Sequence, residues 1–144
     1  MFPEIKLPNH FFRNKGNLQF EDVTDSIANN LPTFSNGSVY ADLDNDGDQD
    51  LIVNNINDPV LLYENKTNTA AVKPSASITL KGPAQNPNAI GSTVVLFAGN
   101  EIRTYEHNPV HGFLSSMQLP IHVGLFNTKI DSAFLIWPDQ SYQS

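Results

Sequence analysis

The stretch Asp42-Leu43-Asp44-Asn45-Asp46-Gly47-Asp48-Gln49-Asp50 is the most acidic part of the chain. It holds five of the 15 acidic residues, all at odd positions, with a glycine at its sixth position. Like charges at this density repel one another, and a divalent cation is the simplest counter-charge. Ca²⁺ takes about six to eight oxygen ligands from flexible loops. The pattern therefore predicts a calcium site.

Five residues would supply the oxygens of this site: the side chains of Asp42, Asp44, Asp46 and Asp50, and the main-chain carbonyl of Asp48. Gly47 would make the sharp bend that turns the backbone inward. Mg²⁺ fits less well, because it prefers a near-ideal octahedron and keeps its waters. So many protein ligands leave little room for a substrate, so we expect a structural role. The alternative is a solvated turn without metal.

The residues on both sides of the acidic loop favour β-strands. Residues 38–41 lead into the loop, residues 51–54 leave it, and residues 60–64 return beside them. An EF-hand loop would instead continue into a helix and carry a glutamate at position 12. Position 12 is Val53, within a β-branched run. The loop therefore joins two strands and is not an EF-hand.

The rest of the chain also has the composition of short strands and turns. Residues 10–13 and 18–21 are predicted strands before the loop, and the polar residues 65–75 form a linker or boundary. Beyond it, Gly99-Asn100 predicts a hairpin between strands at 92–98 and 101–106. Further strands are expected at 78–80, in two runs within 116–126, and at 130–137. We therefore predict an all-β protein.

The first half resembles one FG-GAP/VCBS repeat. The matching stretches are residues 20–24, 36–41, the acidic loop, 50–53 and 62–65. In that family each repeat is a four-stranded β-propeller blade, and the loop between its first two strands binds Ca²⁺. Residues 10–14 resemble the last strand of a preceding blade. Ser38-Val39-Tyr40 replaces the Gly-Ala-Pro part of the motif, which moves the match towards the VCBS branch.

Residues of about 76–140 resemble the ASPIC/UnbV module, which ends arrays of such repeats in secreted proteins similar to cartilage acidic protein. The matching stretches are residues 88–94, 112–116, 122–125 and the closing Trp137-Pro138-Asp139. The family usually has glycine after that aspartate, where this chain has Gln140. Neither resemblance implies a catalytic residue.

These observations predict three parts: a propeller-type blade with a calcium loop at 1–68, a linker at 69–75, and a small antiparallel β-sandwich-like domain at 76–144. The expected function is non-catalytic: a calcium-binding adhesion or ligand-display module for a protein or glycan, outside the cell or in its envelope. We expect a piece of a longer repeat protein, whose signal peptide lies outside this chain. Further blades or a second copy would cover the blade's edges. The alternative is an accessory or substrate-binding part of a glycan-active hydrolase.

Other functions are disfavoured by composition. The eight basic residues are scattered, so nucleic acid or an anionic membrane is an unexpected partner. No apolar run approaches the roughly 20 residues of a membrane span, and there is no cysteine. His107 and His111 lie beside Pro109 and Gly112, which oppose the helix that a zinc pair of this spacing needs. No nucleophile elbow surrounds Ser115 or Ser116, so a triad of either serine with His122 is not expected.

Overall fold

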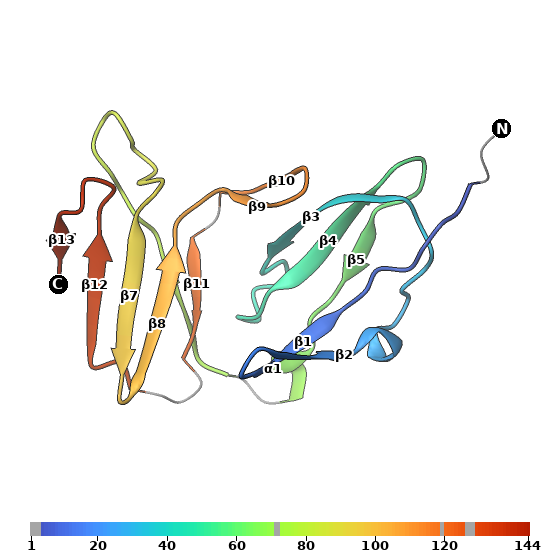
Figure 1. Cartoon of the computed structure of the whole chain (residues 1–144), viewed down its shortest axis with the longest axis horizontal. Helices are drawn as coiled ribbons and strands as arrows, with labels where there is room; N and C mark the ends of the chain where they lie inside the picture. The colour runs from blue at the N-terminus through green and yellow to red at the C-terminus, as the bar shows by residue number, and fades with distance from the viewer. Residues whose placement is uncertain (1–3, 71–72, 119, 126–128) are drawn as a thin grey trace.

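The computed structural model describes residues 4–70, 73–118, 120–125 and 129–144, and β-strands dominate these residues. The strands form antiparallel sheets in two groups that lie side by side along the molecule (Figure 1). The elements are β1 (Phe12–Gly16), β2 (Gln19–Asp22), a 3-10 turn (Thr24–Ser26), β3 (Ser35–Ala41), β4 (Asp50–Asn55), β5 (Leu61–Tyr63), α1 (Thr67–Ala70), β6 (Ser75–Ile78), β7 (Thr93–Ala98), β8 (Glu101–Glu106), β9 (Val110–Gly112), β10 (Ser115–Ser116), β11 (Ile121–Gly124), β12 (Ser132–Ile136) and β13 (Tyr142–Gln143).

The first half is built around the three-stranded sheet β3-β4-β5, whose first two strands are joined by the acidic loop. β1 and β2 pair only with each other, as a separate hairpin. Tyr63 of β5 connects the sheet β3-β4-β5 with the chain on either side of this hairpin, because its ring meets Phe11 edge-on and its hydroxyl bonds to Asn9 and Asn30. The four-stranded blade that the repeat family implies is not reproduced. Past β5 the chain forms α1, and β6 pairs with β11 instead of β5.

The second half is a small two-layer arrangement. One layer is the four-stranded sheet β13-β12-β7-β8, and the other is the ribbon β11-β6. Alternate residues of β7 face inward, so Val94 and Leu96 meet Ile121 and Val123 of β11 in the main hydrophobic cluster. Each of these four side chains is at most 8% exposed. The second half therefore has its own apolar core.

The first half is held mainly by polar groups. Among its described residues Val53 is the one buried hydrophobic side chain. Its other buried residues are Thr33, Asp48, Asp50, Asn55 and Asn68. Large apolar side chains such as Phe20 and Leu62 are 63% and 60% exposed. Burial of apolar surface therefore contributes less to the stability of this half than to that of the second half.

The hairpin β9-β10 reaches from the second half across to β3 (Figure 1). The Ser38 N–H donates to Ser115 Oγ at 2.9 Å. The Tyr40 hydroxyl lies 3.3 Å from His111 Nδ1, with the two rings edge to face. The hairpin is thus one of the contacts that set the two halves against each other.

The predicted strands around the acidic loop and the hairpin at Gly99-Asn100 are confirmed by β3, β4, β7 and β8. The strand expected at 78–80 begins earlier, as β6, because its partner β11 pairs with residues 75–78. Within residues 116–126 the described strands are the end of β10 and all of β11, while Leu119 and Phe126 lie outside the described residues. No helix of the described residues has the length and apolar character needed to cross a bilayer.

Candidate cation site in the acidic loop

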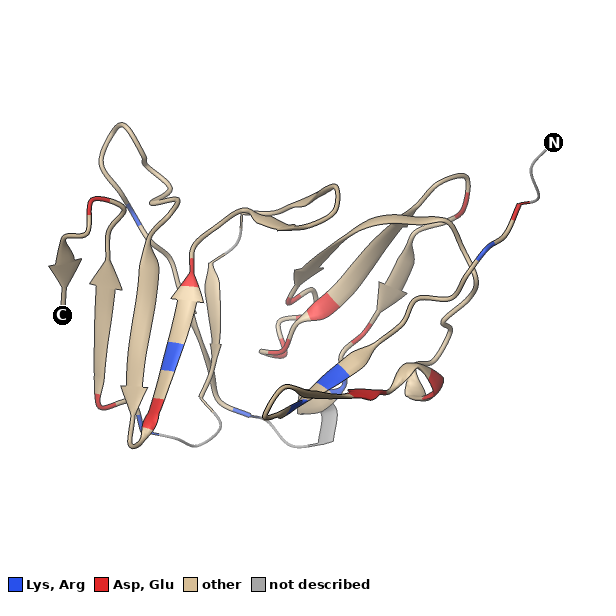
Figure 2. Ribbon diagram, in the orientation of Figure 1, with Lys and Arg blue, Asp and Glu red and all other residues tan. Residues whose placement is uncertain are grey.

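The acidic loop folds as a tight turn at the end of the β3-β4 hairpin nearest to the second half (Figures 1 and 2). Two positions have left-handed backbone, Asn45 with φ 60° and Gly47 with φ 89°. A Cβ on Gly47 would lie 3.0 Å from Ser75 Oγ, so this position favours glycine by both conformation and space. The bend expected at Gly47 is present.

Backbone N–H groups of the loop donate to its carboxylates. The Gly47 N–H donates to Asp42 Oδ2 at 3.1 Å, and the Asp46 N–H to Asp44 Oδ1 at 3.2 Å. The Asp48 N–H donates to Asp46 Oδ1 at 2.9 Å. Each bond occupies one oxygen of a carboxylate and holds its side chain over the loop. The sequence folds in this way because short aspartate side chains readily accept bonds from nearby backbone amides.

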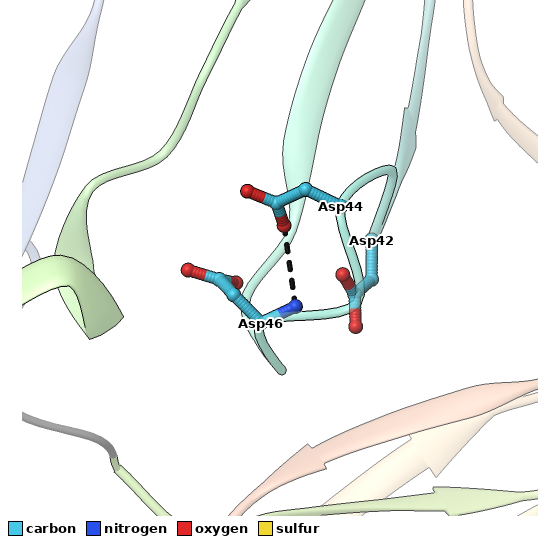
Figure 3. A group of neighbouring side chains, drawn as sticks. All are labelled: Asp42, Asp44 and Asp46. Carbon is cyan, nitrogen blue, oxygen red and sulfur yellow. Dashed lines mark hydrogen bonds between the residues drawn. The ribbon is translucent and has the colours of Figure 1, made fainter.

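Asp42, Asp44 and Asp46 gather at one point of the loop (Figure 3). Each offers a carboxylate oxygen, and these oxygens all lie within 4.8 Å of one another. Two charges 4 Å apart repel by about 1 kcal/mol in bulk water and about 4 kcal/mol near a protein surface. Asp42 Oδ1 is buried and has no hydrogen-bond partner among the described residues. The set of hard oxygen donors fits a divalent cation.

Asp48 and Asp50 lie outside this group of three, and both are buried. Asp48 is 7% exposed, its Oδ2 accepts the Asn68 N–H, and its Oδ1 has no partner among the described residues. Burial raises the pKa of Asp48, and the charges of the neighbouring loop aspartates act in the same direction. Asp50 uses both oxygens, accepting the Leu43 N–H at 3.0 Å and the Asn65 N–H at 2.8 Å. Asp50 therefore fixes the loop against β4 and the chain after β5.

Two asparagines that the loop pattern does not include complete the site. Asn65 Nδ2 donates to the Gln49 carbonyl at 3.2 Å, and Asn68 Nδ2 donates to the Asp46 carbonyl at 2.9 Å. Both residues lie in the polar segment 65–75, predicted above as a linker or boundary, at the end of the predicted blade 1–68. Their signal in the sequence is weak, because they lie 16 and 22 residues beyond their acceptors.

A hollow with a volume of about 400 Å³ lies between the two halves. Tyr40 and Gln49 line it from the first half, and Glu106 and three histidines line it from the second: His107, His111 and His122. His107 Nε2 lies 2.9 Å from the Asn88 carbonyl oxygen, and His111 contacts Tyr40. Among the described residues these histidines belong to no converging group of three or more metal-ligating side chains.

Ser115 has a structural position. Its hydroxyl donates to the Phe113 carbonyl at 2.8 Å and accepts the Ser38 N–H at 2.9 Å. The Ser115 hydroxyl therefore bonds to two backbone groups, and the residue is 7% exposed.

One family model matches part of the second half. Residues 82–144 match the family model described as ASPIC and UnbV. This match begins after β6 and includes β7–β13. None of the curated proteins matches the chain.

Proposed function

We propose that this chain, whose residues 82–144 match ASPIC and UnbV, is a non-catalytic calcium-binding module that displays a binding surface outside the cell or in its envelope. The observation that carries the proposal is the buried carboxylate oxygen Asp42 Oδ1, which lacks a partner among the described residues and belongs to a residue of the converging group Asp42, Asp44 and Asp46. A buried charge without a partner is strongly unfavourable, and a bound cation removes that cost.

Asp42, Asp44 and Asp46 would hold the cation, because their oxygens already converge. The Asp48 carbonyl and the Asp50 side chain remain the further ligands expected from the loop pattern, with Asp50 also fixing the loop. The ion would cancel repulsion among the carboxylates and stiffen the β3-β4 hairpin. This role suits a half that has a single buried hydrophobic residue among those described.

The exposed apolar side chains of the first half support a blade within a longer repeat protein. Phe12, Phe20 and Leu62 are each at least 60% exposed. A neighbouring repeat stacked on this half, or a second copy, would cover them. The Lys and Arg of the described residues are spread over both halves, which fits a partner other than nucleic acid (Figure 2).

Thermal unfolding with CaCl₂ and with EDTA tests this function. If free Ca²⁺ exceeds its Kd about a hundredfold, the folded state gains about 2.7 kcal/mol. For a chain of this length that gain raises Tm by about 5–10 °C. The variant D44A/D46A should lose the shift, while E4A/D25A, which removes two acids outside the loop, should keep it. An equal shift in D44A/D46A would refute the site.

A second candidate function rests on the hollow between the halves. Its lining combines tyrosine rings with amide side chains, a combination that suits stacking on and hydrogen bonding to a sugar. This would be the substrate-binding part of a glycan-active protein. Chemical-shift perturbation by neutral oligosaccharides at Tyr40, Tyr105 and Gln118 would support it. Shifts confined to the exposed outer face of β8 would count against it.

A further inference from the structure

Asn68 connects the acidic loop with the chain that enters the second half. It is 7% exposed. Its N–H donates to Asp48 Oδ2 and its Nδ2 to the Asp46 carbonyl, both at 2.9 Å. On its other side, its Oδ1 accepts the Lys73 N–H at 2.9 Å. One buried amide therefore holds both segments at once.

The segment that Asn68 holds continues directly into the second half. The Pro74 carbonyl accepts the Leu125 N–H at 2.8 Å, and Ser75 begins β6 opposite Gly124 of β11. The loop also approaches β6 itself, because a Cβ on Gly47 would lie 3.0 Å from Ser75 Oγ. A change in loop geometry is thus transmitted through few atoms to the edge of the second half.

We infer that Asn68 couples cation binding in the acidic loop to the orientation of the second half, an inference that rests on the proposed calcium site. The two loop groups that Asn68 holds are the Asp46 carbonyl and the Asp48 carboxylate. The second oxygen of Asp48 is buried without a partner among the described residues. A cation held by the Asp46 side chain and the Asp48 carbonyl would fix the positions of both residues, and through their bonds to Asn68 it would also fix Lys73 and the start of β6. Asn68 is a positioning residue, not a ligand.

A second contact between the halves includes no residue of the acidic loop. The hairpin β9-β10 meets β3 through the bond from the Ser38 N–H to Ser115 Oγ, which includes no residue of the acidic loop. Loosening this bond should change how the halves sit without changing cation affinity. The variant S115A is therefore the matched control for N68A.

The experiment measures calcium affinity and inter-half distance on the same full chain. The chain has no cysteine, so N54C and T104C, both at exposed positions in β4 and β8, give one spin-labelled pair. Calorimetry with CaCl₂ gives the Kd, and pulsed dipolar spectroscopy gives the distance distribution. In the labelled parent, Ca²⁺ should narrow the distribution. N68A removes the side-chain bonds to the Asp46 carbonyl and the Lys73 N–H and keeps the main-chain bond to Asp48. Its Kd should rise about fivefold, as expected for the one bond to the loop that is lost, and its distance distribution should stay broad at saturating Ca²⁺.

The possible outcomes distinguish failure of the coupling through Asn68 from failure of the calcium site itself. A parent that shows no heat with CaCl₂ refutes the calcium site, and the coupling with it. If the parent chain binds Ca²⁺ and the distance distribution of N68A narrows as much as that of the parent, the calcium site stands and only the role of Asn68 is refuted. A Kd in S115A that rises as much as in N68A also refutes it, because any loosened contact would then act alike. If circular dichroism shows N68A unfolded, N68S serves as the milder variant, with the same expected results.

Discussion

Asp50 Oδ1 accepts the backbone N–H of Asn65 at 2.8 Å, and this bond ties the start of β4 to the chain that leaves β5. The other oxygen of Asp50 accepts the Leu43 N–H at 3.0 Å, and Asp50 is 4% exposed. A carboxylate that is buried and engaged twice by backbone holds the loop together whether or not a cation is bound.

Without metal, replacing Asp50 should therefore lower the free energy of unfolding more than replacing Asp44 does. In EDTA, D50A should lower the free energy of unfolding by about 2–4 kcal/mol, because two backbone donors lose their acceptor. D50N keeps an acceptor oxygen and should lose less. D44A, at an exposed position, should change stability by under about 1 kcal/mol in EDTA. Urea denaturation measures all three, and equal losses in D50A and D44A would contradict the distinction.

The hydrophobic core of the second half should dominate stability in the absence of metal. Leu96 is 4% exposed and packs among β7, β11 and β6 residues. L96A should destabilise the chain by about 2–5 kcal/mol through lost burial and the cavity left behind.

The matched control for L96A is L62A, which makes the same change in β5, where Leu62 is 60% exposed. It should cost under about 1 kcal/mol in EDTA. Denaturation curves followed by Trp137 fluorescence report on the second half directly. A larger loss in L62A would place the stabilising core in the first half instead.

The pKa of Asp139 offers a local test near the end of the chain. The Ser141 hydroxyl, and then the Ser141 N–H, donate to the Asp139 carboxylate and lower its pKa. A pKa lowered by folding stabilises the protein above the unfolded value, and this contribution is lost as pH falls through the folded value. S141A should therefore raise the pKa of Asp139 towards its ordinary value.

Carbon-detected NMR titration measures this change. Asp22, whose pKa is lowered by bonds from Thr24, is the internal control and should not move in S141A. An unchanged Asp139 in S141A would mean that the hydroxyl bond is absent in solution.

Local patterns were sufficient for the elements around the loop. Alternating apolar residues and a β-branched run predict β3 and β4, and Gly99-Asn100 predicts the β7-β8 hairpin. The calcium-loop spacing also predicts that Asp42, Asp44 and Asp46 converge, as they do, whereas the side chains of Asp48 and Asp50 lie outside their group.

Contacts between distant segments could not be predicted from local sequence patterns. The pairing of β6 with β11 joins residues more than 40 positions apart, and the polar segment before β6 carries no sequence pattern that predicts this pairing. The same pairing leaves β5 without the fourth strand that the repeat family implies. Asn68 looks like an ordinary linker residue in the sequence, because its function depends on the loop coming back to it.

The most direct test of the account is calorimetric titration of the full chain with CaCl₂ after removal of metal by EDTA and dialysis. The account predicts saturable binding of one Ca²⁺ per chain, weaker binding of Mg²⁺, loss of binding in D44A/D46A, and unchanged binding in E4A/D25A. A flat titration of the parent chain, or a titration of D44A/D46A that matches the parent, would contradict it.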